Sequence, residues 1–195
     1  SSMFNGCTSL TTAPELPATT LSDQCYSAMF YGCTSLTTAP VLKATKMYQN
    51  CYSSMFNGCT SLTTAPELPA TTLSDFCYQY MFQNCTNLVT PPSSLPATTL
   101  VSNCYNGMFY DCTSLTTAPE LPATTLVTYC YYNMFYGCRH LNYIKCLATN
   151  ISANGSTTSW VYNVSSTGTF VKDENMNNWA TGTSGIPNGW TIQDA

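Results

Sequence analysis

The chain repeats one segment, Cys25-Tyr26-Ser27-Ala28-Met29-Phe30-Tyr31-Gly32-Cys33. Further copies run over 51–59, 77–85, 104–112 and 130–138, and each keeps Cys-Tyr, Met-Phe and the closing Cys. The Met-Phe pairs begin at positions 3, 29, 55, 81, 108 and 134, which is a period of 26 residues with one step of 27. A fixed period of this length indicates an array of stacked repeats with one core running through all of them.

The spacing of apolar residues inside the segment predicts a short helix. Cys25, Met29 and Cys33 lie four positions apart, which places them on one helical face. Asp23 precedes the segment as an N-cap residue, and Gly32 stands where a helix would end. We therefore expect a helix of about two to three turns in each repeat. The residues expected in the core of two successive copies are Cys25, Met29, Phe30, Cys33, Cys51, Met55, Phe56 and Cys59.

The residues between successive copies predict a short extended segment. Residues 8–16 are rich in Thr and contain Pro14, and a proline ends a strand because it has no backbone N–H to donate. Leu10 and Leu16 return in later repeats, so we expect them to form rungs of the core. The Thr residues should line up as ladders on stacked parallel strands.

Residues 148–195 differ in kind from residues 1–147. They contain many Asn, Ser, Thr and Gly residues, no Cys, and the tryptophans Trp160, Trp179 and Trp190. Short strands are predicted at 159–164, at 167–172 and after a turn within 185–192. We interpret 1–147 as the repeat array and 148–195 as a capping segment whose aromatic residues cover the open end of the core. The alternative is a separate sugar-binding or attachment module with exposed tryptophans.

Composition excludes several classes of protein. Charged residues make up only 7% of the chain and the net charge is −4, which argues against a nucleic-acid-binding surface. No apolar run approaches the roughly 18 residues of a membrane-spanning segment. There is no signal peptide at the start, and residues 1–23 are identical to residues 53–75, so we infer a piece of a longer protein that begins in mid-repeat.

The twelve cysteines follow the repeat. Eleven of them occupy two columns, where a column is the set of equivalent positions in successive repeats. Buried free thiols packed as small apolar groups are favoured. Disulfides between neighbouring rungs, about 5 Å apart, are the open alternative. Metal binding is disfavoured, because a C-x7-C spacing is no zinc motif and the single histidine, His140, lies outside the pattern.

The repeated motif resembles that of a known family of repeat proteins. Met-Phe-x-x-Cys-Thr-Ser-Leu followed by a proline-bounded segment resembles the BspA-type leucine-rich repeats of bacterial surface proteins, in the Met-Phe-x-Gly-Cys-Thr-Ser-Leu form seen in gut Bacteroidetes and their phages. The resemblance covers residues 1–147. It implies an α/β leucine-rich-repeat solenoid with a short strand and a short helix in each repeat of about 26 residues, closed by a small β-rich C-terminal cap. It also implies an exported, non-catalytic protein of adhesion or recognition.

Function is predicted from the surface, since no set of residues suits catalysis, a cofactor or a metal. Tyr31, Tyr110, Tyr132 and Tyr136 fall on the expected outer face of the helices. They either shield the helices or form a recognition stripe, a role that suits exposed tyrosine. We expect a recognition or adhesion module that is extracellular or on a cell surface and binds a protein or a glycan there, without nucleic acid. The alternative is a structural spacer or phage appendage with no ligand of its own.

Overall fold

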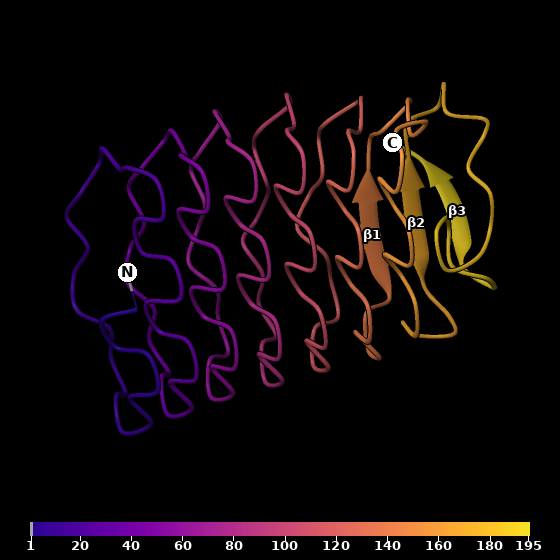
Figure 1. Ribbon diagram of the computed structural model, residues 1–195. Coiled ribbons are helices and arrows are strands. Elements are labelled where there is room, and N and C mark those ends of the chain that lie inside the picture. The colour runs from indigo at the N-terminus through magenta and orange to yellow at the C-terminus, as the bar shows by residue number, and fades with distance from the viewer. Residues whose placement is uncertain (1) are drawn as a thin grey trace.

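The computed structural model describes residues 2–195 and consists of a stack of similar coils, one for each repeat (Figure 1). Successive coils lie side by side from the N-terminal end of the stack toward the C-terminal end (Figure 1). Single parallel bridges join equivalent residues of neighbouring coils, as between Thr12 and Thr38 or between Thr64 and Thr90. The period of the sequence therefore becomes the step of the stack.

Regular strands form at the C-terminal end of the stack. Strands β1 (Tyr143–Cys146), β2 (Thr169–Lys172) and β3 (Thr191–Asp194) pair in parallel in the order β1-β2-β3 (Figure 1). Their register places Tyr143 opposite Thr169 and Thr169 opposite Thr191. β2 falls inside the predicted segment 167–172, whereas residues 159–163 form turns instead of the predicted strand at 159–164.

The predicted helix in each repeat is wrong, because residues 2–195 contain no helix. Consecutive tight turns take its place. Within residues 50–59, each odd-numbered N–H donates to the carbonyl three residues earlier in the same coil, as from Met55 to Tyr52 at 3.1 Å. Each even-numbered N–H donates to the next coil, as from Phe56 to Met81 at 2.9 Å. Both kinds of bond are needed to satisfy the buried backbone, and the second kind joins the coils.

Left-handed residues explain why the segment turns instead of forming a helix. Asn50, Ser54 and Gly58 have φ values of 54°, 55° and 75°, and their counterparts repeat this spacing of four residues in the other full coils. A positive φ is required at the third residue of a type II turn and is incompatible with a right-handed helix. One column contains only residues that tolerate this backbone, namely Gly6, Gly32, Gly58, Asn84, Asp111, Gly137 and Asn163.

The two halves of each coil have different structures. We call residues 22–33 and their counterparts the turn side, and residues 8–21 and their counterparts the proline side. The strand predicted on the proline side is reduced in residues 2–142 to isolated bridges, so the short strand per repeat is also not formed there. The expected leucines still point inward, and Leu36, Leu62, Leu88 and Leu115 are fully buried.

Aromatic rings from the turn side stack along the whole core. Neighbouring phenylalanines lie 5.5–5.6 Å apart between ring centroids in the series Phe4, Phe30, Phe56, Phe82, Phe109 and Phe135. A parallel series contains Tyr26, Tyr52, Tyr78, Tyr105 and Tyr131. Trp160 contacts the last ring of both series, and Trp179 stacks on Trp160 at 5.5 Å. Each buried ring stabilises the stack by about 1.5–3 kcal/mol through loss of apolar surface to water.

The twelve cysteines are free thiols, and ten of them are buried. The Sγ atom of Cys59 donates to the carbonyl of Phe30 in the preceding coil at 3.1 Å, and Cys85 donates to Phe56 at the same distance. Burial raises the pKa of the Cys59 and Cys77 thiols to about 12. The thiols therefore act as neutral donors between coils and are poor nucleophiles.

Candidate functional site: an aromatic face on the turn side

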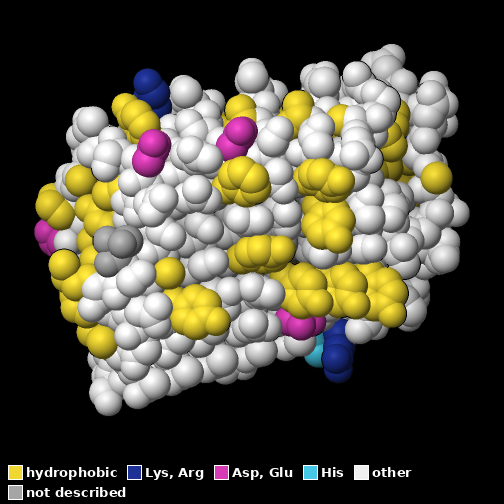
Figure 2. Space-filling model, viewed as in Figure 1, with side chains coloured by type: hydrophobic (Ala, Val, Ile, Leu, Met, Phe, Trp, Pro, Cys, Tyr) yellow, Lys and Arg dark blue, Asp and Glu magenta, His cyan; other side chains and the backbone are white. Residues whose placement is uncertain are grey.

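The outer surface of the turn side carries a row of stacked tyrosines. The rings of Tyr110 and Tyr136 lie 4.6 Å apart and nearly parallel, and Tyr136 stacks on Tyr162 at the same centroid distance. These three residues, the tyrosine row, occupy one column in three successive coils. Figure 2 shows a line of hydrophobic side chains across one face of the stack, with acidic, basic and histidine side chains at its lower edge. Stacking of this kind fixes the rings, so that they present a rigid contact surface.

A second group of tyrosines belongs to the same side of the stack. Tyr129 and Tyr132 meet edge to face, with ring centroids 5.6 Å apart. The ring of Tyr80 lies against Gly107 of the next coil, where an added Cβ would collide with it. Gly155 receives the ring of Tyr129 in the same way. The absence of a side chain at Gly107 and Gly155 thus allows the rings of Tyr80 and Tyr129 to pack against the backbone of the following coil.

Electrostatic effects connect the two groups. Burial raises the pKa of Tyr80, and the nearby Tyr132 raises it further. Burial also raises the pKa of Tyr110, followed by the effects of Tyr136 and Asp111 and, more weakly, of Tyr80. Tyr80 is therefore close enough to interact electrostatically with both Tyr132 and Tyr110. The phenol groups of Tyr80 and Tyr110 stay protonated at neutral pH and can both donate and accept hydrogen bonds.

The structure places three of the four predicted binding residues in this region and separates the fourth from it. Tyr110 and Tyr136 are in direct contact, and Tyr132 belongs to the second group. Tyr31 shares the column of the tyrosine row and is 44% exposed, but two coils stand between them. Those coils carry Asn57 and Gln83 in that column, joined by a hydrogen bond of 2.7 Å.

Sequence reasoning missed Tyr80, Tyr129 and Tyr162. Tyr162 is 45% exposed and lies 26 residues after Tyr136, so the repeat period extended into the tail would have found it. The strand predicted at 159–164 included this residue instead. Tyr80 and Tyr129 occupy left-handed positions, with φ of 54° each, and bulky residues are rare there. The helical spacing places both columns on the outer face, but nothing in it singles out these two residues.

The residues predicted for the core lie as follows. Met29, Phe30, Cys33, Cys51, Met55, Phe56 and Cys59 are buried, and Cys25 is half-buried. Position and environment thus agree with a structural role for their side chains. Outside the first coil, where Met3 and Cys7 are exposed, mainly the variable columns of the turn side face solvent.

Other chemistry is sparse in the part of the chain that the structure describes. No three His, Cys, Asp or Glu side chains of residues 2–195 are grouped to hold a metal ion. The Nδ1 atom of His140 lies 2.6 Å from the carbonyl oxygen of Thr113 on an exposed edge. Within the same residues, no helix of a length and hydropathy suited to crossing a bilayer is present.

Stacked coils with a continuous core define this chain as a repeat protein, whose surfaces are built from equivalent positions in successive coils. The family model of the BspA type leucine-rich repeat region matches in six copies, over residues 1–106 and 74–169. The chain therefore belongs to the BspA-type leucine-rich repeat family.

Two solved structures are similar to this chain over most of its length. A leucine-rich repeat protein of T. pallidum is 19% identical, with 82% of this chain and 72% of that chain covered and a TM-score of 0.38. A leucine-rich repeat protein from Bacteroides ovatus is 16% identical, with 98% of this chain and 62% of that chain covered and a TM-score of 0.37. At these TM-scores neither likeness bears on how the coils are built. A search of the curated proteins gave no significant match.

Proposed function

We propose that the chain is a non-catalytic recognition or adhesion module that binds a protein or a glycan at a cell surface. The stacked tyrosine row of Tyr110, Tyr136 and Tyr162 carries this proposal. Tyrosine supplies a large amphipathic contact area at low entropic cost, and the stacking has already ordered these side chains. The chain belongs to a family of repeat proteins, and such proteins are suited to interactions between macromolecules. Because the proposed ligand lies at a cell surface, we also propose that the protein is exported.

A triple variant tests the proposal. Tyr110→Ser, Tyr136→Ser and Tyr162→Ser together remove the row but no fully buried ring, so the melting temperature should change little. The wild type and the variant are applied to a glycan array and to an array of cell-surface and secreted proteins. We expect hits of the wild type to weaken by at least about tenfold in the variant, since interface tyrosines are frequent hot spots.

Tyr31→Ser is the matched control, because Tyr31 is an exposed tyrosine of the same column outside the row. It should leave every hit unchanged. Hits that survive the triple variant, or that fall equally with Tyr31→Ser, would place the binding surface elsewhere.

A structural spacer remains the second candidate, favoured by the identity of residues 1–23 and 53–75 even at surface positions. Such identity is expected where no position is tuned to a ligand. A spacer would give no hit in either array.

We also propose that residues 148–195 cap the array formed by residues 1–147. Trp160 is fully buried, Trp190 is nearly so, and the Nε1 atom of each donates to a backbone carbonyl at 2.8 Å. Trp160 stacks on Tyr131 of the preceding coil and on Trp179, and this burial argues against a sugar-binding module that uses exposed tryptophans. Deleting residues 176–195 should therefore lower the melting temperature of the whole array instead of leaving it unchanged.

A further inference from the structure

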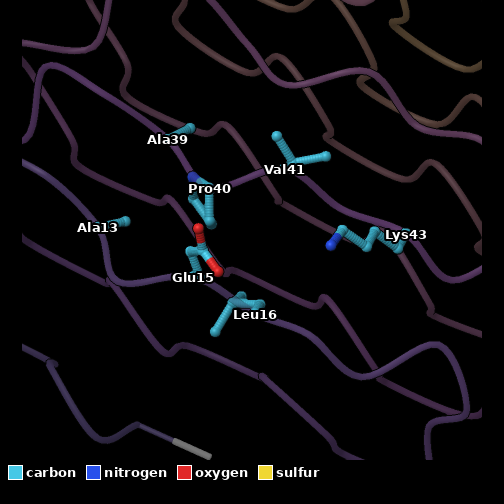
Figure 3. A pocket seen from close by; sticks show the side chains of 7 residues that line it. All are labelled: Ala13, Glu15, Leu16, Ala39, Pro40, Val41 and Lys43. Carbon is cyan, nitrogen blue, oxygen red and sulfur yellow. The ribbon is translucent and has the colours of Figure 1, made fainter.

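A small cavity of about 260 Å³ lies on the proline side between the first two coils (Figure 3). Its apolar lining includes Leu16, Pro40 and Val41. Val41 is 71% exposed and presents its side chain to solvent beside the cavity. Glu15 and Lys43 provide the only charged groups that line the cavity. It lies on the proline side of the coils, so it is independent of the aromatic face proposed above.

The column of Glu15 shows why its carboxylate is available. In that column a glutamate is normally held by the next coil: Glu67 accepts hydrogen bonds from the N–H and hydroxyl of Ser93, and Glu120 forms an ion pair of 2.6 Å with Lys145. The next coil offers Glu15 only the apolar Val41 at this position. Among residues 2–195, the Glu15 side chain has no hydrogen bond or ion pair.

Lys43 also departs from the repeat, and its positive charge is opposite to that of Glu15. Its counterparts in four other coils are Pro17, Pro69, Pro96 and Pro122, so only this coil places a cation there. The ammonium end of Lys43 points toward the Glu15 carboxyl across the cavity (Figure 3), but within residues 2–195 the two form no ion pair. Opposite charges thus face each other over an apolar surface without meeting.

We propose that this cavity binds a small zwitterion with an aliphatic side chain, of the class of a free amino acid or dipeptide. The ligand's ammonium group would donate to Glu15, its carboxylate would accept from Lys43, and its side chain would cover Val41. The cavity is smaller than the roughly 300–1,000 Å³ of sites for drug-sized ligands, which suits a ligand of this size. Each end of the ligand gains a charge-assisted hydrogen bond that an uncharged analogue lacks.

Titration calorimetry with L-leucine, N-acetyl-L-leucine and L-leucinamide tests the proposal on the chain as it stands. The acetylated compound has lost the positive charge and the amide has lost the negative one. We expect L-leucine to bind, and each analogue to bind at least about tenfold more weakly, as expected for loss of one hydrogen bond to a charged group.

Variants assign the two contacts. Glu15→Gln should reduce L-leucine affinity by about tenfold and abolish the preference over N-acetyl-L-leucine, and Lys43→Met should abolish the preference over L-leucinamide. Glu67→Gln is the matched control, since that carboxylate is held by Ser93, and it should bind L-leucine normally. All three residues are exposed, so unchanged melting curves are expected.

Several results would overturn the proposal. One is the absence of heat with L-leucine at millimolar concentration. Another is equal binding of all three compounds, which would reveal an apolar pocket without charge recognition. A third is an equal loss in Glu67→Gln, which would place the ligand in another coil. None of these results affects the binding proposed for the tyrosine row.

Discussion

The turn side and the proline side of each coil satisfy their backbones in different ways. On the turn side, alternate N–H groups bond within the coil and to the next coil, as at Met55 and Phe56. On the proline side before residue 143, neighbouring coils are joined by fewer and less regular backbone hydrogen bonds around isolated bridges such as Thr12 with Thr38, as from Ala13 to Thr38 at 3.1 Å. The turn side therefore provides the more continuous hydrogen bonding between coils, while the proline side connects one set of turns to the next.

Departures from the repeat fall where this difference allows them. The replacement of the usual turn by Lys43–Met47 and the extra residue near Pro91–Ser94 both lie on the proline side. The turn side keeps its length in every full copy from 25–33 to 130–138. A residue inserted there would shift every later hydrogen bond to the wrong coil, whereas a connecting segment tolerates one more residue.

The largest expected effect that distinguishes the turn side from the proline side is loss of stability at alkaline pH. All ten buried thiols have a pKa raised by burial, with values of about 12 for Cys59, Cys77 and Cys146. Nine of these ten thiols, all except Cys146, lie on the turn side. A thiol with a higher pKa in the folded state stabilises the fold fully below about pH 9, and this stabilisation is lost as the pH rises toward 12.

A thiol with a pKa of about 11 or 12 removes about 1.4 kcal/mol from the free energy of unfolding per pH unit above about 9. For Cys59, Cys77, Cys130 and Cys146 together the loss is about 5–6 kcal/mol within the first pH unit, which is comparable to the stability of a typical domain. We therefore expect thermal melts followed by circular dichroism to show unfolding near pH 10. Cys7→Ser, at an exposed thiol, should not change the curve. A melting temperature that stays constant from pH 8 to 10 would mean that the cysteines are oxidised or open to solvent.

A smaller but still large effect is expected from Phe82→Ala. The ring of Phe82 is fully buried and stacks on Phe56 at 5.6 Å and on Phe109 at 5.5 Å, so its removal leaves a cavity in the middle of the stack. The loss of stability should be about 3–5 kcal/mol. Val89→Ala, at a half-exposed residue on the proline side of the same repeat, should cost less than about 0.5 kcal/mol.

Denaturant titration of both variants gives the comparison directly. A cost for Phe82→Ala that is no greater than the cost for Val89→Ala would show that the stacked rings do not hold the coils together.

Much of this architecture could be predicted from the period alone. The period identified the array, and the positions that keep their residues, such as Met55 and Phe56, are those that the structure buries. Periodicity could not distinguish a helix from a series of turns, because an apolar residue at every fourth position also fits turns that repeat every four residues. The backbone hydrogen bonds that decide between them run to another coil and leave no local pattern.

The aromatic face was harder to predict than the core. Tyr110 and Tyr136 were found because they share a column, but the same column also suggested Tyr31, which the structure separates from them. Whether two tyrosines of one column stack depends on the residues in the intervening coils, here Asn57 and Gln83. The left-handed column of Gly32, Gly58 and Asn84 was visible in the sequence and marks the turns more directly than the apolar spacing does.

A pair of backbone substitutions gives the smallest effect and tests the turns themselves. Gly58 has φ of 75°, and an added Cβ would make only ordinary contact with Gly32, so Gly58→Ala changes the backbone preference without a clash. It should cost about 1–2 kcal/mol.

Ala28 has φ of 50° in another left-handed column, so Ala28→Gly relieves strain of the same kind. Because glycine also makes the unfolded chain more flexible, the net gain should be only about 0.5–1 kcal/mol. Chemical denaturation of both variants measures these two changes. Since alanine favours a helix over glycine, opposite signs, with Gly58→Ala stabilising and Ala28→Gly destabilising, would mean that these segments are helical in solution.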